Sequence, residues 1–105
     1  MPGYAAAVRE ARGAPRDEVM HRTRANDGEG RSIKLVLVNM SANGFMARCE
    51  GEPVAGDRLR VQLPILGDVD AVVRWSLGGR IGCELDHTIP LAEYYGMLSI
   101  MIRHI

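Results

Sequence analysis

The chain has 105 residues, of which 47% are hydrophobic, and its 13 basic side chains are balanced by 13 acidic ones. This length suits one domain with a single core, and the balanced charge excludes a general electrostatic attraction to nucleic acid or to an anionic membrane. Two cysteines are too few for a disulfide framework, and neither a bilayer-spanning apolar run nor a signal peptide is recognisable, so we expect a cytoplasmic protein with reduced thiols and no membrane insertion.

Glycine, proline and small residues dominate the start of the chain. Pro15 disfavours a helix around it, because the residue before a proline is pushed toward extended backbone. We therefore expect residues 1–10 to be a flexible lead-in and residues 11–105 to form the domain. Arginine is concentrated in this first third of the chain and Lys34 is the single lysine. Arginine suits bidentate contacts with phosphate and guanine, although a GC-rich genome would give the same excess.

Between about residues 17 and 87, apolar and polar residues alternate in stretches that are separated by turn signals. Asn43-Gly44 is a strong hairpin signal, because both residues tolerate positive φ. Period-two alternation places one face of a strand in the core, and the stretches predict about six strands of an all-β fold. The stretch 18–25 is more polar and predicts an edge or rim strand. The side chains expected inside are Ile33, Leu35, Leu37, Phe45, Ala47, Cys49, Leu59, Val61, Leu63, Val69, Ala71, Val73, Trp75, Ile81, Cys83 and Leu85.

The end of the chain changes to a helical pattern. Thr88 can cap a helix and Pro90 suits its first turn. We expect this helix, at about residues 89–105, to close the open end of the barrel. Met97 and Ile100 make its other side apolar as well, which leaves open a surface for a partner or for a homodimer. The residues that recur at helical spacing are Leu91, Tyr94, Tyr95, Leu98, Met101, Ile102 and Ile105.

Two short motifs carry the chemistry. The first is an Arg-x-x-x-Arg formed by Arg12 and Arg16, and the second is an Asn-x-Ser-x-x-Gly that begins at Asn39, 23 positions after Arg16. Two guanidinium groups can engage phosphate oxygens, stack on a purine or bind the O6/N7 edge of guanine. Asn39 and Ser41 offer amide and hydroxyl hydrogen bonds. Gly44 can adopt φ > 0 and bring backbone close to a ligand.

In order, spacing and placement at a turn, these motifs resemble the signature of the PilZ family, small β-barrel receptors for the bacterial second messenger cyclic di-GMP. The resemblance runs from about residue 11 to the C-terminus and includes the apolar strand ending at Trp75, the Gly78-Gly79 turn and a closing helix. It implies a six-stranded antiparallel β-barrel of PilZ type at about residues 17–87, followed by the helix.

The resemblance also implies a role for each motif residue. Arg12 and Arg16 would clamp the phosphates and guanine faces of cyclic di-GMP, Asn39 and Ser41 would hydrogen-bond a guanine edge, and Gly44 would permit close approach. Family members bind either one copy or an intercalated dimer of the ligand, and both stoichiometries stay open. Binding is expected to order the arginine segment and so create a surface for a downstream protein. No cofactor is implied besides this ligand.

Three other functions compete with this one. A nucleotide-independent PilZ-like adaptor would act only through protein contacts; the apolar helix favours it and the intact motifs oppose it. An oligonucleotide-binding barrel needs aromatic platforms, and Trp75 is expected in the core, so we expect no nucleic-acid partner. His21, His87 and His104 stand at no metal-ligand spacing, and Ser41 has no neighbouring base. We therefore expect neither a metal site nor catalysis.

Overall fold

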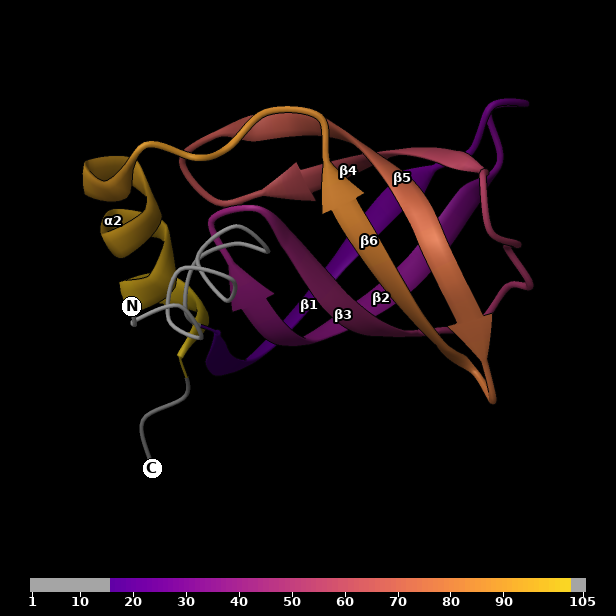
Figure 1. Cartoon of the computed structure of the whole chain (residues 1–105), viewed down its shortest axis with the longest axis horizontal. Helices are drawn as coiled ribbons and strands as arrows, with labels where there is room; N and C mark the ends of the chain where they lie inside the picture. Colours follow the sequence, from indigo (N-terminus) through magenta and orange to yellow (C-terminus); the bar gives the residue numbers. More distant parts are fainter. Residues whose placement is uncertain (1–15, 103–105) are drawn as a thin grey trace, which may run out of the picture.

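The computed structural model describes residues 16–102 as a β-barrel with one helix against its end (Figure 1). The expected lead-in, residues 1–10, lies outside the described residues, as does Arg12. The described elements are β1 (Asp17–Asn26), β2 (Ser32–Ser41), β3 (Gly44–Cys49), β4 (Arg58–Leu63), β5 (Gly67–Leu77), β6 (Arg80–Leu85) and α2 (Leu91–Met101).

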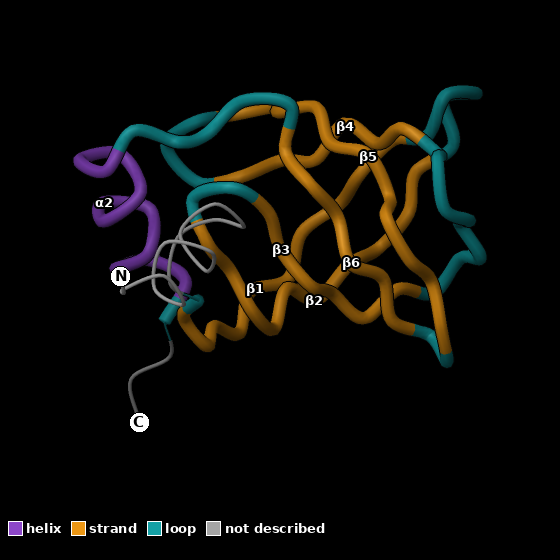
Figure 2. Tube along the Cα trace, viewed as in Figure 1, coloured by secondary structure: helices purple, strands orange, loops and turns teal. Residues whose placement is uncertain are grey.

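The six strands pair antiparallel in the order β1-β2-β3-β6-β5-β4 and close into a barrel (Figure 2). This confirms the predicted fold. β1 pairs with β2 between Asp17 and Asn26, but it pairs with β4 only at Ala25 and Asn26. The prediction of an edge strand at 18–25 is therefore wrong at its C-terminal end, because β4 completes the hydrogen-bonding ladder there.

The barrel interior is filled by the apolar face that the alternation predicts. Leu37, Ala47, Val61, Ala71 and Val73 have no exposed surface. Burial of apolar surface stabilises a fold by about 25 cal/mol per Å², so these buried side chains stabilise the barrel wall. The wall is therefore a firm support for the groups on its outer face.

Trp75 departs from the alternation, because it is 43% exposed where the pattern predicts a core position. The register between β5 and β6 shifts after Val73, so that Val73 pairs with Cys83 and Trp75 pairs with Gly82. The extra residue, Arg74, makes a β-bulge that reverses the direction of the following side chain. The prediction that Trp75 lies inside the barrel is wrong for this reason.

Helix α2 lies against the end of the barrel at which β1 begins, which confirms the closing helix (Figure 1). Its buried face differs from the predicted one: Met97 is fully buried, whereas Leu91 and Tyr95 are 60% and 61% exposed. A homodimer through this exposed side stays a prediction. No helix within residues 16–102 is long and apolar enough to cross a membrane. The buried helix residues are Tyr94, Met97, Leu98 and Met101.

Candidate functional site

The Asn-x-Ser-x-x-Gly motif forms the end of β2, a tight turn and the start of β3. Ser41 pairs with Gly44, so Ala42 and Asn43 make the turn between them. Neither Asn43 nor Gly44 has a positive φ. The prediction of a positive-φ hairpin at Asn43-Gly44 is therefore wrong, and the turn begins one residue earlier.

Gly44 is required for a different reason, the close approach of two strands. It pairs with Glu84 of β6, and a Cβ built on it would lie 2.3 Å from the carbonyl oxygen of Cys83. No side chain fits at that distance, so β3 and β6 can approach each other here only if this residue is glycine.

The turn is anchored to the segment that joins β6 to α2. The N–H of Ile89 donates to the carbonyl of Ala42 at 2.9 Å, and the Thr88 hydroxyl donates to Oδ1 of Asn43 at 2.7 Å. The prediction that Thr88 caps the helix is wrong, because Pro90 stands at the N-cap without a side-chain cap bond. These contacts hold the turn in one conformation, which lowers the entropic cost of binding a ligand there.

The strand register arranges outward-facing residues of the site in a row across four strands. Asn39 pairs with Met46, Met46 with Gly82, and Gly82 with Trp75. Because neighbouring strands are ~4.8 Å apart, the two ends of this row, Asn39 and Trp75, are separated by about 14 Å. A ligand of that width can reach both ends of the row.

A neighbouring row begins with Arg16, which precedes the first paired residue of β1 and continues its register toward Ser41. Arg16, Ser41 and Gly44 line one hollow of about 690 Å³ on the outer wall, and Trp75 lines it from β5. The structure thus brings together three of the five residues expected from the sequence. Arg12 lies outside the described residues, and Asn39 does not line this hollow.

Trp75 lies directly over Gly82. A Cβ built on Gly82 would be 2.1 Å from Nε1 and 2.4 Å from Cε2 of the indole. The glycine therefore makes room for the aromatic ring, which stays 43% exposed beside Arg16, Ser41 and Gly44. The alternation of the sequence did not identify this residue as part of the site. A glycine inside an apolar strand was the available signal, because such a glycine marks close packing by a neighbour.

Asn39 has a buried acceptor without a donor. Its Oδ1 atom is buried and accepts no hydrogen bond from any group within residues 16–102. The residue follows a register shift after Leu37 in the β2–β3 pair. An unpaired buried acceptor is destabilising, so a donor brought close to it by a ligand would be favourable.

Two carboxylates line the hollow, and each has a cation partner. Arg74 Nη2 lies 2.6 Å from Glu84 Oε1, and Arg58 forms an ion pair with Asp86. This pairing offsets the repulsion that the carboxylates would exert on an anionic ligand. Burial raises the pKa of Cys83 to about 12, so its thiol stays neutral at physiological pH and is a poor nucleophile.

In the described part of the chain, no three His, Cys, Asp or Glu side chains stand together as metal ligands. The chemistry that the site offers is a guanidinium, a hydroxyl, an amide and an exposed indole on a firm wall. These groups suit an anionic ligand with aromatic rings.

The family comparison covers most of the chain. The model of the family described as PilZ domain matches residues 10–98. This range includes both motifs and all six strands, together with the start of α2. No curated protein matches the chain.

Proposed function

Because the chain belongs to the PilZ domain family, we propose that it is a bacterial receptor for cyclic di-GMP that acts in the cytoplasm. The observation that carries the proposal is the convergence of Arg16, Ser41 and Gly44 on one hollow of the barrel wall. PilZ domains are binding modules rather than enzymes, so the function is to hold this ligand and to signal its presence to a protein partner.

Arginine supplies the charge that the ligand needs. Arg16 is exposed and forms no ion pair within residues 16–102. In this proposal Arg12 and Arg16 bind the phosphates and guanine faces of cyclic di-GMP through bidentate, charge-assisted contacts. Ser41 is already oriented, because its Oγ accepts a hydrogen bond from the N–H of Asn43 at 3.2 Å. Its hydroxyl and the free acceptor of Asn39 would hydrogen-bond a guanine edge.

Trp75 adds a stacking surface. Its indole is exposed at the hollow and supported from beneath by the backbone at Gly82. Guanine stacks well on such a ring, and base–aromatic stacking contributes about 1–3 kcal/mol per base. The ligand would then span the wall, with arginine contacts near the hairpin and a base on Trp75.

Helix α2 is the element through which we expect binding to be signalled. Asp17, which follows Arg16 directly, accepts a hydrogen bond from the Tyr94 hydroxyl at 2.7 Å, and the carbonyl oxygen of Met40 lies 3.1 Å from that hydroxyl. Burial and then the Asp17 contact raise the pKa of Tyr94, which keeps it a donor. In this proposal, ordering of the arginine segment by the ligand is passed to α2 and to a downstream protein.

The proposal is tested by isothermal titration calorimetry of the full chain with cyclic di-GMP, with GTP and cyclic di-AMP as control ligands. We expect saturable, selective binding and a stoichiometry of one or two. Arg12→Ala and Arg16→Ala should each weaken binding by about 1.5–3 kcal/mol. The matched control is Arg31→Ala, because Arg31 is ion-paired with Asp27 in the β1–β2 turn and does not line the hollow.

Two results would contradict the proposal. One is wild-type affinity in the Arg12→Ala/Arg16→Ala double variant, which would place the ligand elsewhere. The other is the absence of heat with cyclic di-GMP, confirmed by a second method. That result would leave the fold as it is and would favour the nucleotide-independent adaptor, for which the exposed apolar side of α2 offers a surface.

A further inference from the structure

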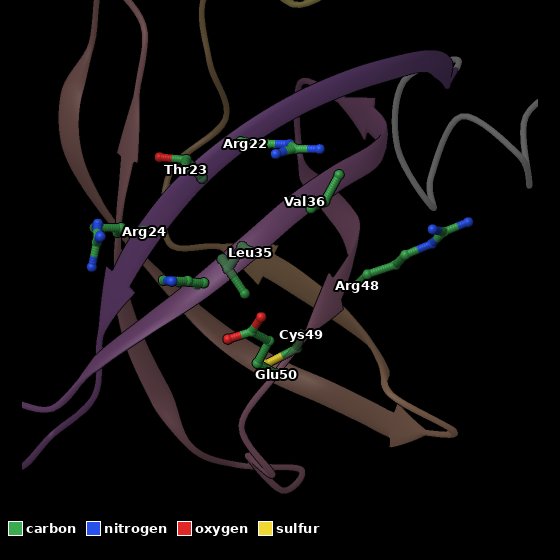
Figure 3. A pocket seen from close by; sticks show the side chains of 9 residues that line it. Arg22, Thr23, Arg24, Leu35, Val36, Arg48, Cys49 and Glu50 are labelled. Carbon is green, nitrogen blue, oxygen red and sulfur yellow. The ribbon is translucent and has the colours of Figure 1, made fainter.

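A second hollow, of about 640 Å³, lies on the outer face of β1, β2 and β3 (Figure 3). It shares no lining residue with the hollow that contains Arg16. The two adjoin along β3, because Met46 of the first and Arg48 of the second are two residues apart on the same face of the strand. This second hollow is therefore a separate surface, beyond the one proposed for cyclic di-GMP.

Positive charge dominates the second hollow. In Figure 3 the arginines project from the two outer strands, β1 and β3, which flank β2. Every cation in the lining is exposed, and none forms an ion pair with another residue of the described chain. The lining cations are Arg22, Arg24, Lys34 and Arg48, and Glu50 is the one acidic residue of the lining.

The register places three of the outer-face arginines in one line. Arg22 pairs with Val36, Val36 with Arg48, and Arg48 with Arg80 of β6. Like charges placed directly opposite each other destabilise a sheet. An anionic group bound across Arg48 and Arg80 would offset that repulsion. The barrel is therefore expected to be more stable with an acidic partner bound to this face than without one.

A second line of charge lies two residues further along the strands. Arg24 pairs with Lys34 there, and the two lines are separated by about 6.8 Å, the repeat of side chains on one face of an extended strand. An extended peptide with acidic residues at alternate positions has the same repeat. Its carboxylates match the forked geometry of arginine, which binds them through two parallel hydrogen bonds.

A nucleic-acid partner fits this surface less well, because the lining holds no aromatic ring on which a base could stack. The half-buried Val36, which lies between Arg22 and Arg48 in the first line, gives a small apolar contact, which suits an amino-acid side chain.

We propose that the outer face of β1–β3 docks an extended acidic segment of a partner protein. Its alternate carboxylates bind Arg22, Arg48 and Lys34, and the methylene groups of the acidic side chain above the first line rest on Val36. Because this face adjoins the hollow that contains Arg16, one partner protein could contact both surfaces.

The test is a fluorescence anisotropy titration of the full chain against a labelled peptide of alternating Glu and Val residues. We expect saturable binding that weakens as NaCl is added. Arg22→Gln/Arg48→Gln should bind about tenfold more weakly. The control, Arg58→Gln/Arg60→Gln, removes the same charge from the ion-paired side of the barrel and should bind within about twofold of wild type. Thermal unfolding checks that both variants are folded.

Amide shifts of isotopically labelled protein should map the peptide to Val36 and its neighbours. Absence of saturable binding, or equal weakening in both double variants, would overturn the proposal. A duplex oligonucleotide and phosphatidylglycerol vesicles form the other arms. Tighter binding of either one, with the same dependence on Arg22 and Arg48, would assign the surface to nucleic acid or to membrane and would also overturn it. The affinity of the same Arg22→Gln/Arg48→Gln protein for cyclic di-GMP is measured in parallel. This measurement distinguishes a failure of the docking proposal from a failure of the receptor proposal.

Discussion

The two halves of the barrel wall present cations outward in the same alternating pattern and use them differently. On β4 to β6 three of the four arginines are ion-paired, whereas Arg80 of β6 and the lining cations of β1 to β3 have no carboxylate partner in the described part of the chain. Strand register, rather than residue type, thus decides whether an outward arginine stabilises the barrel or is free for a ligand. The ion pairs are Arg58–Asp86, Arg60–Asp70 and Arg74–Glu84.

The candidate site lies where these two halves meet. Arg16 and Ser41 come from the side with unpaired cations, and Trp75 comes from the ion-paired side. Each half is therefore expected to contribute differently to binding: charge and hydrogen bonds from one, a stacking surface from the other.

Among the strand residues, the largest expected effect on binding comes from removing the contribution of the ion-paired half. Trp75→Ala should weaken cyclic di-GMP binding by about 1–3 kcal/mol, because a base loses its stacking partner. Calorimetry measures the loss. Leu77→Ala is the matched control, since Leu77 is 78% exposed on the same strand and does not line the hollow. An equal effect of both substitutions would show that Trp75 has no specific role.

The next effect tests the junction between the halves. Gly44→Ala should lower the free energy of unfolding by about 1–3 kcal/mol, because its Cβ would overlap the backbone of β6. Urea denaturation gives the value. The control is Gly28→Ala, since a Cβ at Gly28 meets nothing within 4 Å. If Gly44→Ala is as stable as that control, the close approach of β3 and β6 is not what requires the glycine.

Much of the fold could be predicted because its cause is local. Alternation of apolar residues determines which face of each strand is buried, and the closely spaced turn signals separate the strands. The Gly78-Gly79 turn follows this logic, with φ of 62° and 81°. The arrangement of charges could not be predicted in the same way, because Arg58 and Asp86 are 28 positions apart and meet only once the register is fixed.

The errors at the site have the same origin. One extra residue at Arg74 turns Trp75 outward, and no propensity in the sequence marks that bulge. Thr88 is a residue type that commonly caps a helix, but its hydroxyl donates instead to Asn43 in the β2–β3 turn. The position of Trp75 and the hydrogen bond of Thr88 both depend on contacts between strands or segments rather than on neighbours in sequence. Periodicity could therefore place Ser41 and Gly44, but not the indole ring of Trp75 beside them.

A smaller effect contrasts the two kinds of arginine directly. Arg74→Gln breaks an exposed ion pair with Glu84 and should lower stability by ~0.2–1 kcal/mol, whereas Arg48→Gln removes repulsion from Arg80 and should leave stability unchanged or slightly raised. Urea denaturation at low and high NaCl measures both, and salt should shrink the difference. A loss at Arg48 as large as that at Arg74 would mean that Arg48 has a stabilising partner.

The smallest expected effect is a dependence on pH. Burial lowers the pKa of His21 in β1, so the folded state binds a proton less readily than the unfolded state. Its contribution is therefore present above the unfolded pKa of about 6.5 and is lost as pH falls through the folded pKa. Stability measured between pH 7.5 and 5 should fall less steeply in His21→Gln than in wild type. Parallel curves would contradict a role for His21.

The most direct test of the receptor account uses Trp75 as a reporter, because it is the single tryptophan of the chain. Its emission is followed while cyclic di-GMP is added, with cyclic di-AMP and the Arg16→Ala variant as references. The account predicts saturable quenching by cyclic di-GMP that is weakened in Arg16→Ala. Unchanged Trp75 emission at ligand concentrations where calorimetry detects saturation would contradict it, because the ligand would then bind away from the hollow that Arg16, Ser41 and Gly44 line.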